Sequence, residues 1–307
     1  ALASGRAMKV LVARCDRLGD LVLALPVFPW LKRRRPGWEV HALVAASAAP
    51  LIENDPAVDA IYTWHGTDDP ELEHKLASER YDAALILQFQ TPLAAMLRRC
   101  GIRRRHGPLS KPASWWLLNR GAWQGRSRSR RHERDYNLDL ARRLAGRGEP
   151  AGEPVIHLRP EQRAAGRRLR DELAPGAQTV ALVHPGSGGS ALDWEPARFA
   201  AVAAALAGRP GWRVFVTGSH HDRLVVDRVA PHLDPRVTLL AERFPLREFL
   251  GFVAAADVMI APSTGPLHMA AALGAAAVGL YPPAPTMGPR RWGPRGPWSR
   301  ALEPAVS

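Results

Sequence analysis

The sequence predicts an α/β protein made of two doubly wound domains. Three observations carry this prediction. The length of 307 residues exceeds the usual size of one hydrophobic core. Short apolar segments alternate with helix-length segments, which is typical of parallel sheets. A second alternation of the same kind follows a stretch rich in Gly, Pro and charge at 146–154, where we place the linker.

The first half begins with a strand at 9–13, a polar loop at 14–19 and a helix over 20–32. Further strands are predicted at 38–45, 58–64 and 82–88, and further helices at 71–80 and 136–145. These elements define an N-terminal domain over residues 8–150. The seven residues before Met8 are left out of the fold prediction.

The second half repeats the alternation and defines a C-terminal domain over residues 151–307. Its predicted strands are 179–184, 212–217, 237–240, 258–261 and 277–281, and its predicted helices are 196–206, 223–230, 246–256 and 266–273. The segment 282–297 is rich in Pro, Gly and Trp and is predicted to be a loop. We expect the tail after about residue 282 to return to the first domain.

The net charge of +13 points to anionic partners. Between Arg98 and Arg134, twelve Lys or Arg stand against one acid, Glu133, and Trp115, Trp116 and Trp123 lie among them. This composition suits an amphiphilic anionic acceptor at a membrane surface, and equally single-stranded nucleic acid. A solvated loop is the third interpretation.

Several classes of protein are disfavoured. No stretch of 18 apolar residues and no secretory signal pattern is present, so we expect a cytoplasmic protein. Cys15 and Cys100 have neither metal-ligand nor redox spacing. The run at 220–222 (HHD) is not expected to bind a metal, because neighbouring histidines point to different faces.

Three segments can carry chemistry at the carboxyl ends of predicted strands. At 263–268 (STGPLH), Ser and Thr at cap-like positions, Gly and a first-turn Pro predict a helix start that favours an anion, or simply a well-capped helix. The small residues at 184–190 (HPGSGGS) suit a phosphate nest or a plain turn. Asp20 can act as a general base or stabilise a helix N-terminus.

Together, the segments 10–26 (VLVARCDRLGDLVLALP), 184–199 (HPGSGGSALDWEPARF) and 263–274 (STGPLHMAAALG) resemble the heptosyltransferases of glycosyltransferase family 9. The resemblance implies the GT-B architecture of two Rossmann-like domains, in which an acceptor-binding first domain faces a nucleotide-sugar donor-binding second domain across a cleft. It implies inverting transfer of a sugar, expected to be heptose from ADP-heptose, to a hydroxyl of an anionic glycolipid such as the lipopolysaccharide inner core.

The resemblance also implies partners and roles. The enzyme is expected to need no metal or other cofactor, to associate peripherally with the inner face of the cytoplasmic membrane, and to bind no nucleic acid. Asp20 matches the family's catalytic base. The implied donor-binding residues are Ser187, Gly188, Gly189, Asp222, Phe244, Ser263, Thr264, Gly265 and His268, and the implied acceptor-binding residues are Arg14, Arg17, Gly19 and Arg120.

Two positions depart from the family pattern. Ser263 stands where well-known lipopolysaccharide heptosyltransferases carry an Asp that reaches the donor sugar, and Leu192 stands where they carry a phosphate-binding Lys. The candidates to supply that charge are Arg198, Arg290 and Arg291. Two alternatives stay open: a nucleotide-sugar hydrolase or epimerase of the same fold, and a non-catalytic nucleic-acid-binding protein that uses residues 98–134.

Overall fold

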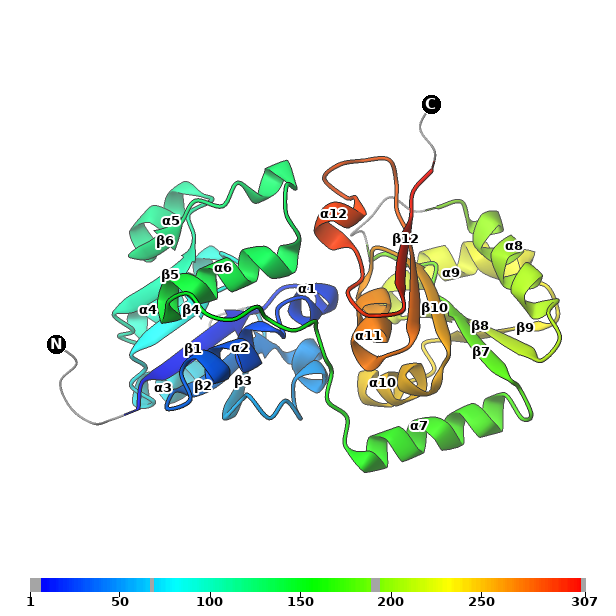
Figure 1. The fold of residues 1–307 in the computed structure, drawn as a ribbon, viewed down its shortest axis with the longest axis horizontal. Coiled ribbons are helices and arrows are strands. Elements are labelled where there is room, and N and C mark those ends of the chain that lie inside the picture. Colours follow the sequence, from blue (N-terminus) through cyan, green and yellow to red (C-terminus); the bar gives the residue numbers. More distant parts are fainter. Residues whose placement is uncertain (1–6, 67–68, 189–193, 305–307) are drawn as a thin grey trace. The chain divides into compact units, whose positions relative to one another are not determined.

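The computed structural model describes residues 7–66, 69–188 and 194–304. The chain divides into two compact units, Ala1–Gly152 and Glu153–Ser307, and each is described by itself. Each unit contains one sheet of six strands accompanied by helices (Figure 1). The neighbouring strands in both sheets are parallel. The α/β class predicted from the sequence is confirmed.

The sheet of the first unit has the order β3-β2-β1-β4-β5-β6. Its strands are β1 (Lys9–Arg14), β2 (Glu39–Ala45), β3 (Ala60–Trp64), β4 (Ala83–Ile86), β5 (Arg104–Pro108) and β6 (Arg120–Ala122). Residues 10–13 of the central strand β1 are apolar and fully buried, between Lys9 and Arg14 at its ends. Helices on both faces of the sheet explain this, because a strand covered on both sides has no polar face.

The helices of the first unit are α1 (Leu18–Val22), α2 (Val27–Arg34), α3 (Pro70–Ser78), α4 (Thr91–Arg99), α5 (Pro112–Leu117) and α6 (Glu133–Ala145), with 3-10 turns η1 (Ala46–Leu51) and η2 (Arg126–Arg128). The prediction of one continuous helix over 20–32 is wrong, because the chain forms two helices there, α1 and α2. The helical structure is interrupted before Pro26, because proline has no N–H to donate and its ring clashes with the preceding turn.

The arginine-rich stretch contains ordered elements that the sequence did not predict. The strands β5 and β6, the helix α5 and the turn η2 all fall between residues 98 and 134. Only the last three residues of β5 are buried, while Arg104 at its start is exposed. This strand was not predicted because its polar side chains interrupt the apolar pattern.

The second unit repeats the topology of the first, with the order β12-β11-β10-β7-β8-β9. Its strands are β7 (Thr179–Val183), β8 (Trp212–Gly218), β9 (Val237–Ala241), β10 (Val258–Pro262), β11 (Ala276–Leu280) and β12 (Ser299–Leu302). Its helices are α7 (Pro160–Leu173), α8 (Pro196–Ala207), α9 (Arg223–Val229), α10 (Leu246–Ala255), α11 (Gly265–Leu273) and α12 (Pro289–Trp292), with 3-10 turns η3 (His220–Asp222) and η4 (Ala230–His232).

The end of the tail forms a strand of the second unit. The strand β12 pairs in parallel with β11, from Ala277 opposite Ser299 to Leu280 opposite Leu302. The short helix α12 lies within the segment predicted to be a loop. Pairing with β12 gives the backbone groups of β11 partners that an edge strand would lack.

Candidate functional site

In the first unit, the loop after β1 lies where the strand order reverses, between β1 and β4. Ligands of doubly wound sheets bind at this switch point, outside the carboxyl ends of the strands. Arg14 ends β1, Arg17 is the N-cap of α1, and Asp20 lies in the first turn of that helix. The fold therefore places the expected base at the edge of the sheet where a ligand is expected.

Arg14 is a buried arginine that holds Asp20. Its Nη2 lies 2.9 Å from Asp20 Oδ1, and its Nε lies 2.7 Å from Asp16 Oδ1. Its Nη1 lies 3.1 Å from Glu133 Oε1 and donates to Asn137 Oδ1, also at 3.1 Å. Only 2% of the side chain is exposed. Three carboxylates compensate the buried charge, and these contacts fix the orientation of the planar guanidinium.

This environment changes the acidity of Asp20. Burial raises the pKa of its carboxyl to about 6, the nearby charges of Asp16 and Glu133 add to the increase, and Arg14 opposes it. The side chain is still 14% exposed, so it is in contact with solvent. A carboxylate with a pKa closer to neutral pH accepts a proton more readily than an ordinary aspartate does.

Glu133 and Asn137 were not predicted from the sequence, and α6 brings them to β1 from more than 100 residues away. Arg126 Nη1 also pairs with Glu133 Oε1 at 2.6 Å, so Glu133 joins two arginines. One signal was available, since Glu133 is the only acid among the twelve Lys and Arg of 98–134. A single acid among so many cations is a candidate for an internal ion pair.

The other predicted acceptor residues are separated by the fold. Arg17 is exposed beside the Arg14 cluster, and Gly19 is buried within α1. Arg120 begins β6, three strands away from β1 and in register with His106. At a spacing of about 4.8 Å per strand, its backbone lies roughly 14 Å from β1. Arg120 is therefore not brought together with Arg14.

In the second unit, the corresponding reversal of strand order lies between β7 and β10. The loop 184–188 follows β7, and Ser263 and Thr264 follow β10. Ser187 is buried and Gly188 is exposed, whereas the predicted Gly189 and the departure at Leu192 lie outside the described residues. Both segments singled out from the sequence therefore flank one switch point, where a nucleotide is expected to bind.

His184 and Asp222 anchor the first of these loops. His184 Nδ1 lies 3.0 Å from Thr217 Oγ1, and its Nε2 lies 3.4 Å from Asp222 Oδ2. Asp222 Oδ2 also accepts from the backbone N–H of Ser219 at 2.9 Å and from its hydroxyl at 2.5 Å. Burial alone raises the pKa of Asp222, but the hydrogen bonds from His184 and Ser219 outweigh it and hold the pKa well below its usual range.

Gly186 lets this carboxylate lie against the loop. A Cβ at position 186 would overlap the side chain of Asp222. His184 was not among the predicted site residues, and Asp222 was expected to bind the donor. Asp222 is 5% exposed and one of its oxygens is engaged within the protein, so its contacts are those of a residue that fixes the loop.

The second loop leads into α11, which begins at Gly265 with Thr264 as its N-cap and Pro266 in the first turn. The Thr264 side chain makes no capping hydrogen bond, so the first N–H groups of the helix are not satisfied by it. Thr264 is 8% exposed and His268, in the same turn, is 4% exposed. A helix start of this kind can bind an anion through N–H groups and the helix dipole.

Ser263 belongs to a hydroxyl pair at the end of β10. Its side chain is hydrogen-bonded to the hydroxyl of Tyr281, which follows β11. The Tyr281 hydroxyl donates in turn to the carbonyl of Trp292 in α12, at 2.5 Å. Ser263 is 8% exposed. Ser263, which replaces the family's Asp, is therefore connected through Tyr281 to α12 in the tail of the chain.

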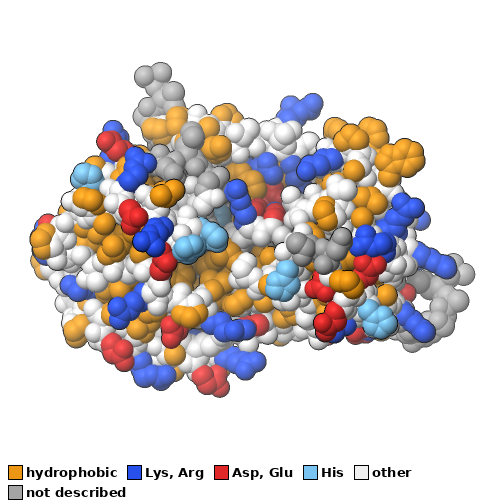
Figure 2. Space-filling view, turned by 180° about the vertical axis from the view of Figure 1, so that it is seen from behind, with side chains coloured by type: hydrophobic (Ala, Val, Ile, Leu, Met, Phe, Trp, Pro, Cys, Tyr) orange, Lys and Arg blue, Asp and Glu red, His pale blue; other side chains and the backbone are white. Residues whose placement is uncertain are grey.

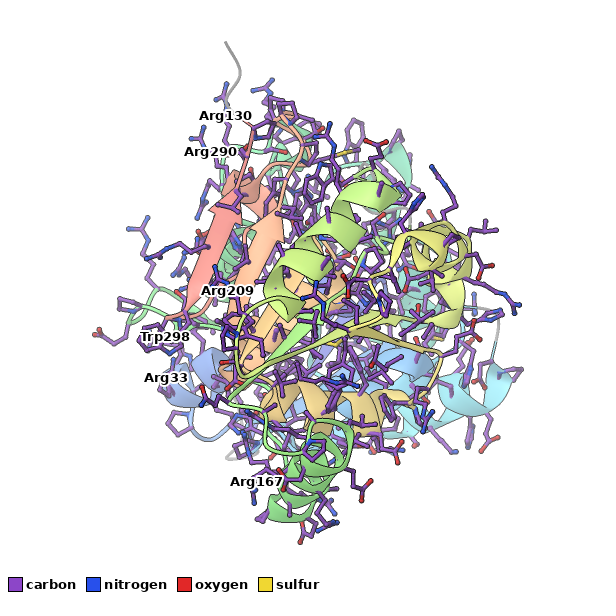
Figure 3. All side chains as sticks on the ribbon, turned by 90° about the vertical axis from the view of Figure 1, so that its right-hand side faces the viewer. Arg33, Arg130, Arg167, Arg209, Arg290 and Trp298 are labelled. Atoms are coloured by element: carbon purple, nitrogen blue, oxygen red, sulfur yellow. The ribbon has the colours of Figure 1, made fainter. Side chains whose placement is uncertain are left out.

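The remaining predicted donor residue and the three candidate arginines lie at the surface of the second unit. Phe244 follows β9, is half-buried, and packs against Phe252 with ring centroids 5.7 Å apart. Arg198 is exposed and pairs with Glu195 at 3.3 Å. Arg290 is exposed at the start of α12 (Figure 3), and Arg291 stacks on Trp292 at 4.3 Å.

One group of side chains has metal-like spacing, although a lysine lies within it. Ligand atoms of Glu39, His41 and Glu79 lie within 4.8 Å of one another. Lys9 Nζ is 3.1 Å from Glu39 and 2.6 Å from Glu79, so an ammonium group already pairs with both acids. Among the described residues, no helix is long and apolar enough to span a membrane.

Comparison with known proteins agrees with this geometry. Residues 70–303 match the family profile described as glycosyltransferase family 9 (heptosyltransferase). A Haemophilus influenzae protein whose name proposes a glycosyltransferase is 31% identical over 93% of this chain and 86% of its own length. Lipopolysaccharide heptosyltransferase 3 of Escherichia coli is 24% identical over 86% of this chain and 80% of its own length.

Solved structures share the fold over nearly the whole chain. The ADP-heptose lipopolysaccharide heptosyltransferase II of E. coli superposes with a TM-score of 0.82 at 22% identity, covering 96% of this chain and 90% of that one. A family 9 glycosyl transferase from Veillonella parvula has a TM-score of 0.84 at 18% identity, covering 97% and 86%. The E. coli heptosyltransferase WaaC with ADP has a TM-score of 0.74 at 19% identity, covering 96% and 93%.

Proposed function

Because this chain belongs to glycosyltransferase family 9, the heptosyltransferase family, we propose that it transfers heptose from ADP-heptose to a hydroxyl of an anionic glycolipid such as the lipopolysaccharide inner core. The observation that carries the proposal is the Asp20 carboxylate, held by Arg14 at the switch point of the first sheet with its pKa raised to about 6. The first unit binds the acceptor and the second binds the donor.

Asp20 acts as the general base. As the acceptor oxygen attacks the anomeric carbon, its proton passes to the Asp20 carboxylate and the bond from that carbon to the diphosphate breaks. A single displacement of this kind inverts the anomeric centre. Arg14 is assigned to hold the base instead of contacting the acceptor, because it is buried and its guanidinium is bonded to Asp16, Asp20 and Glu133.

The second unit stabilises the departing diphosphate. Backbone N–H groups of Gly188 and Gly265, with the hydroxyls of Ser187 and Thr264, receive the negative charge that develops on it. His268 in the first turn of α11 donates to the same group. Because these are protein donors, we propose that turnover needs no metal, and treatment with a chelator should leave the rate unchanged.

The nucleotide is bound by the loops that follow β8 and β9. Phe244 packs against the base from its half-buried position after β9. Asp222 is assigned to fix the phosphate loop through His184 instead of binding the donor directly. Ser263, which is hydrogen-bonded to Tyr281, faces the donor sugar in place of the family's acid.

The acceptor approaches from a membrane surface. Trp115 and Trp116, on the short helix α5, are 62% and 81% exposed, and Lys111 precedes the helix. Figure 2 shows hydrophobic and basic side chains exposed together at the end of the first unit that contains α5. Tryptophans beside cations suit the headgroup region of an anionic bilayer. We therefore place the enzyme in the cytoplasm, peripheral to the inner membrane, with Arg17, Gly19 and Arg120 on the acceptor side.

A thermal-shift panel with ADP, UDP, GDP and their sugars tests the donor. A ligand at about one hundred times its dissociation constant adds about 2.7 kcal/mol to stability. ADP-heptose and ADP should raise the melting temperature, while the uridine and guanosine compounds should not. Stabilisation by UDP or GDP sugars alone would contradict the assignment of the donor.

A further inference from the structure

A pocket in the first unit has a strongly basic lining that the proposed function has not used. Its volume is about 650 Å³, and it lies between the loop around η2 and the helix α6. Six arginines line it, against one acid, Asp139: Arg128, Arg130, Arg131, Arg142, Arg143 and Arg147. A concave surface with this excess of positive charge attracts an anion with several negative groups.

The single acid does not neutralise the pocket. Asp139 pairs with Arg131 and, at 3.2 Å, with Arg142. Within the described ranges of the chain, the side chains of Arg128, Arg130, Arg143 and Arg147 make no ion pair. Four guanidinium groups therefore line one pocket and remain available to a ligand.

The backbone of the loop contributes to this arrangement. Ser129, the residue after η2, has a φ of 47°, in the left-handed region that non-glycine residues rarely adopt. It is 4% exposed, whereas Arg128 and Arg130 on either side of it are exposed and line the pocket. Figure 3 shows Arg130 projecting outward. Such backbone conformations are commonly retained at binding sites.

The size of the pocket and its aromatic side chains restrict the kind of ligand. A volume of this size lies in the range of small-molecule sites, whereas proteins that bind single-stranded nucleic acid use grooves several nucleotides long. Trp123 lines the pocket and is 71% exposed, so its ring is open to contact with a sugar ring. Arginine is suited to phosphate and carboxylate groups because its N–H groups can donate in pairs.

The pocket is also connected to the catalytic base. Tyr136 lines it, and the guanidinium of Arg126 lies over the Tyr136 ring at 5.5 Å. Arg126 pairs with Glu133, which pairs with Arg14, the residue that holds Asp20. The same helix, α6, therefore supplies part of the pocket wall and part of the support for the base.

From this arrangement we infer that the arginine pocket binds a phosphate-bearing sugar of the acceptor glycan, at a distance from the hydroxyl that reacts. The inference rests on the proposed function, because it takes the first unit to be the acceptor unit. It adds a binding site to that function: the pocket holds a phosphate group on an acceptor sugar, and removing that phosphate weakens binding of the acceptor.

Calorimetric titration tests the inference with a deacylated, phosphorylated core oligosaccharide and with the same oligosaccharide after phosphatase treatment. The wild-type protein should bind the phosphorylated form about tenfold or more tightly. The triple variant Arg130→Gln/Arg143→Gln/Arg147→Gln should lose this preference, while Arg130→Lys/Arg143→Lys/Arg147→Lys should keep part of it. A matched control, Arg163→Gln/Arg167→Gln/Arg168→Gln in α7, removes the same charge from the second unit (Figure 3 labels Arg167) and should bind like wild type.

Three results would overturn the inference: equal binding of both oligosaccharides by the wild-type protein, equal loss of binding in the α7 control, or tighter binding of a short RNA at this pocket than of the phosphorylated sugar. ADP-heptose binding is measured on the same samples. If the wild-type protein does not bind ADP-heptose, the proposed donor is refuted, while the result for the pocket still holds. An unchanged melting temperature of the triple variant shows that the variant is folded.

Discussion

The Arg14 guanidinium lies 2.9 Å from the Asp20 carboxylate at the end of β1, and α6 holds this pair through Glu133. The pair has two consequences. Arg14 fixes where the carboxylate lies, while burial and the neighbouring acids keep its pKa near 6. Proton removal from a sugar hydroxyl requires a base whose position is fixed and whose pKa is close to neutral pH.

Replacing Asp20 with Asn should reduce kcat by about a hundredfold or more, because the acceptor proton then has no base to receive it. The dissociation constant for ADP-heptose should stay within about twofold, since the proposed donor site lies on the second unit. Kinetics with saturating acceptor and calorimetric titration of the donor measure the two quantities. A variant with wild-type kcat would remove Asp20 from the mechanism.

The rate should depend on pH through the same carboxyl. Below its pKa of about 6, Asp20 is protonated and cannot accept a proton, so kcat should fall about tenfold per pH unit as the pH decreases. A pH–rate profile from 4.5 to 8 measures this. A profile that stays flat through pH 6 would exclude Asp20 as the titrating base.

The free energy of unfolding should depend on pH in the opposite direction to kcat. The fold raises the pKa of Asp20, so its contribution to stability is complete below about pH 4 and is lost as the pH rises through about 6. Asp20→Asn, which stays neutral, should therefore be more stable than the wild-type protein at pH 8, by up to about 3 kcal/mol, and nearly equal to it at pH 4. Thermal unfolding at the two pH values tests this, and a variant less stable at pH 8 would show that the ionised carboxylate stabilises the fold.

Replacing Glu133 with Gln should move the pH profile. Glu133 adds to the high pKa of Asp20, so its neutral isostere should shift the midpoint of the profile below that of the wild-type protein. A purely structural role would lower the rate at all pH values without moving the midpoint. Comparison with Glu73→Gln, whose partner Arg99 lies on the surface, controls for the loss of one carboxylate.

The sequence was sufficient to predict the α/β class, most of the strands and the three loops at the carboxyl ends of strands. Asp20, Ser187 and Thr264 follow strands with strong apolar patterns, so their positions could be inferred from local spacing. Strand β5 was missed because arginines interrupt its pattern, and β12 because pairing with β11 is a long-range property.

The partners of the site residues could also not be predicted from the sequence. Glu133 approaches Arg14, and Asp222 approaches His184, only after the sheets have formed, so no local pattern links them. The roles expected for Arg14 and Asp222 came from their position in a motif, whereas burial and ion pairing assign both a positioning role. Arg120 was expected to join the acceptor residues, but the strand order separates it from β1.

Replacing Gly186 with Ala should weaken donor binding about tenfold or more. The added Cβ would overlap the Asp222 carboxylate, so the phosphate loop or the carboxylate must move. The acceptor KM should not change. Gly37→Ala is a matched control, because a Cβ there has no heavy atom within 4 Å, and unchanged donor affinity in Gly186→Ala would mean that the position of this loop does not matter for the donor.

The most direct test is a coupled measurement of ADP release, the mass of the acceptor and the anomeric configuration of the product, with ADP-heptose and an inner-core glycolipid. We expect one ADP for each heptose added to the acceptor, and an inverted anomeric centre. Release of ADP and free heptose without any gain in acceptor mass would identify a hydrolase, and a retained anomeric centre would contradict a single displacement with Asp20 as the base.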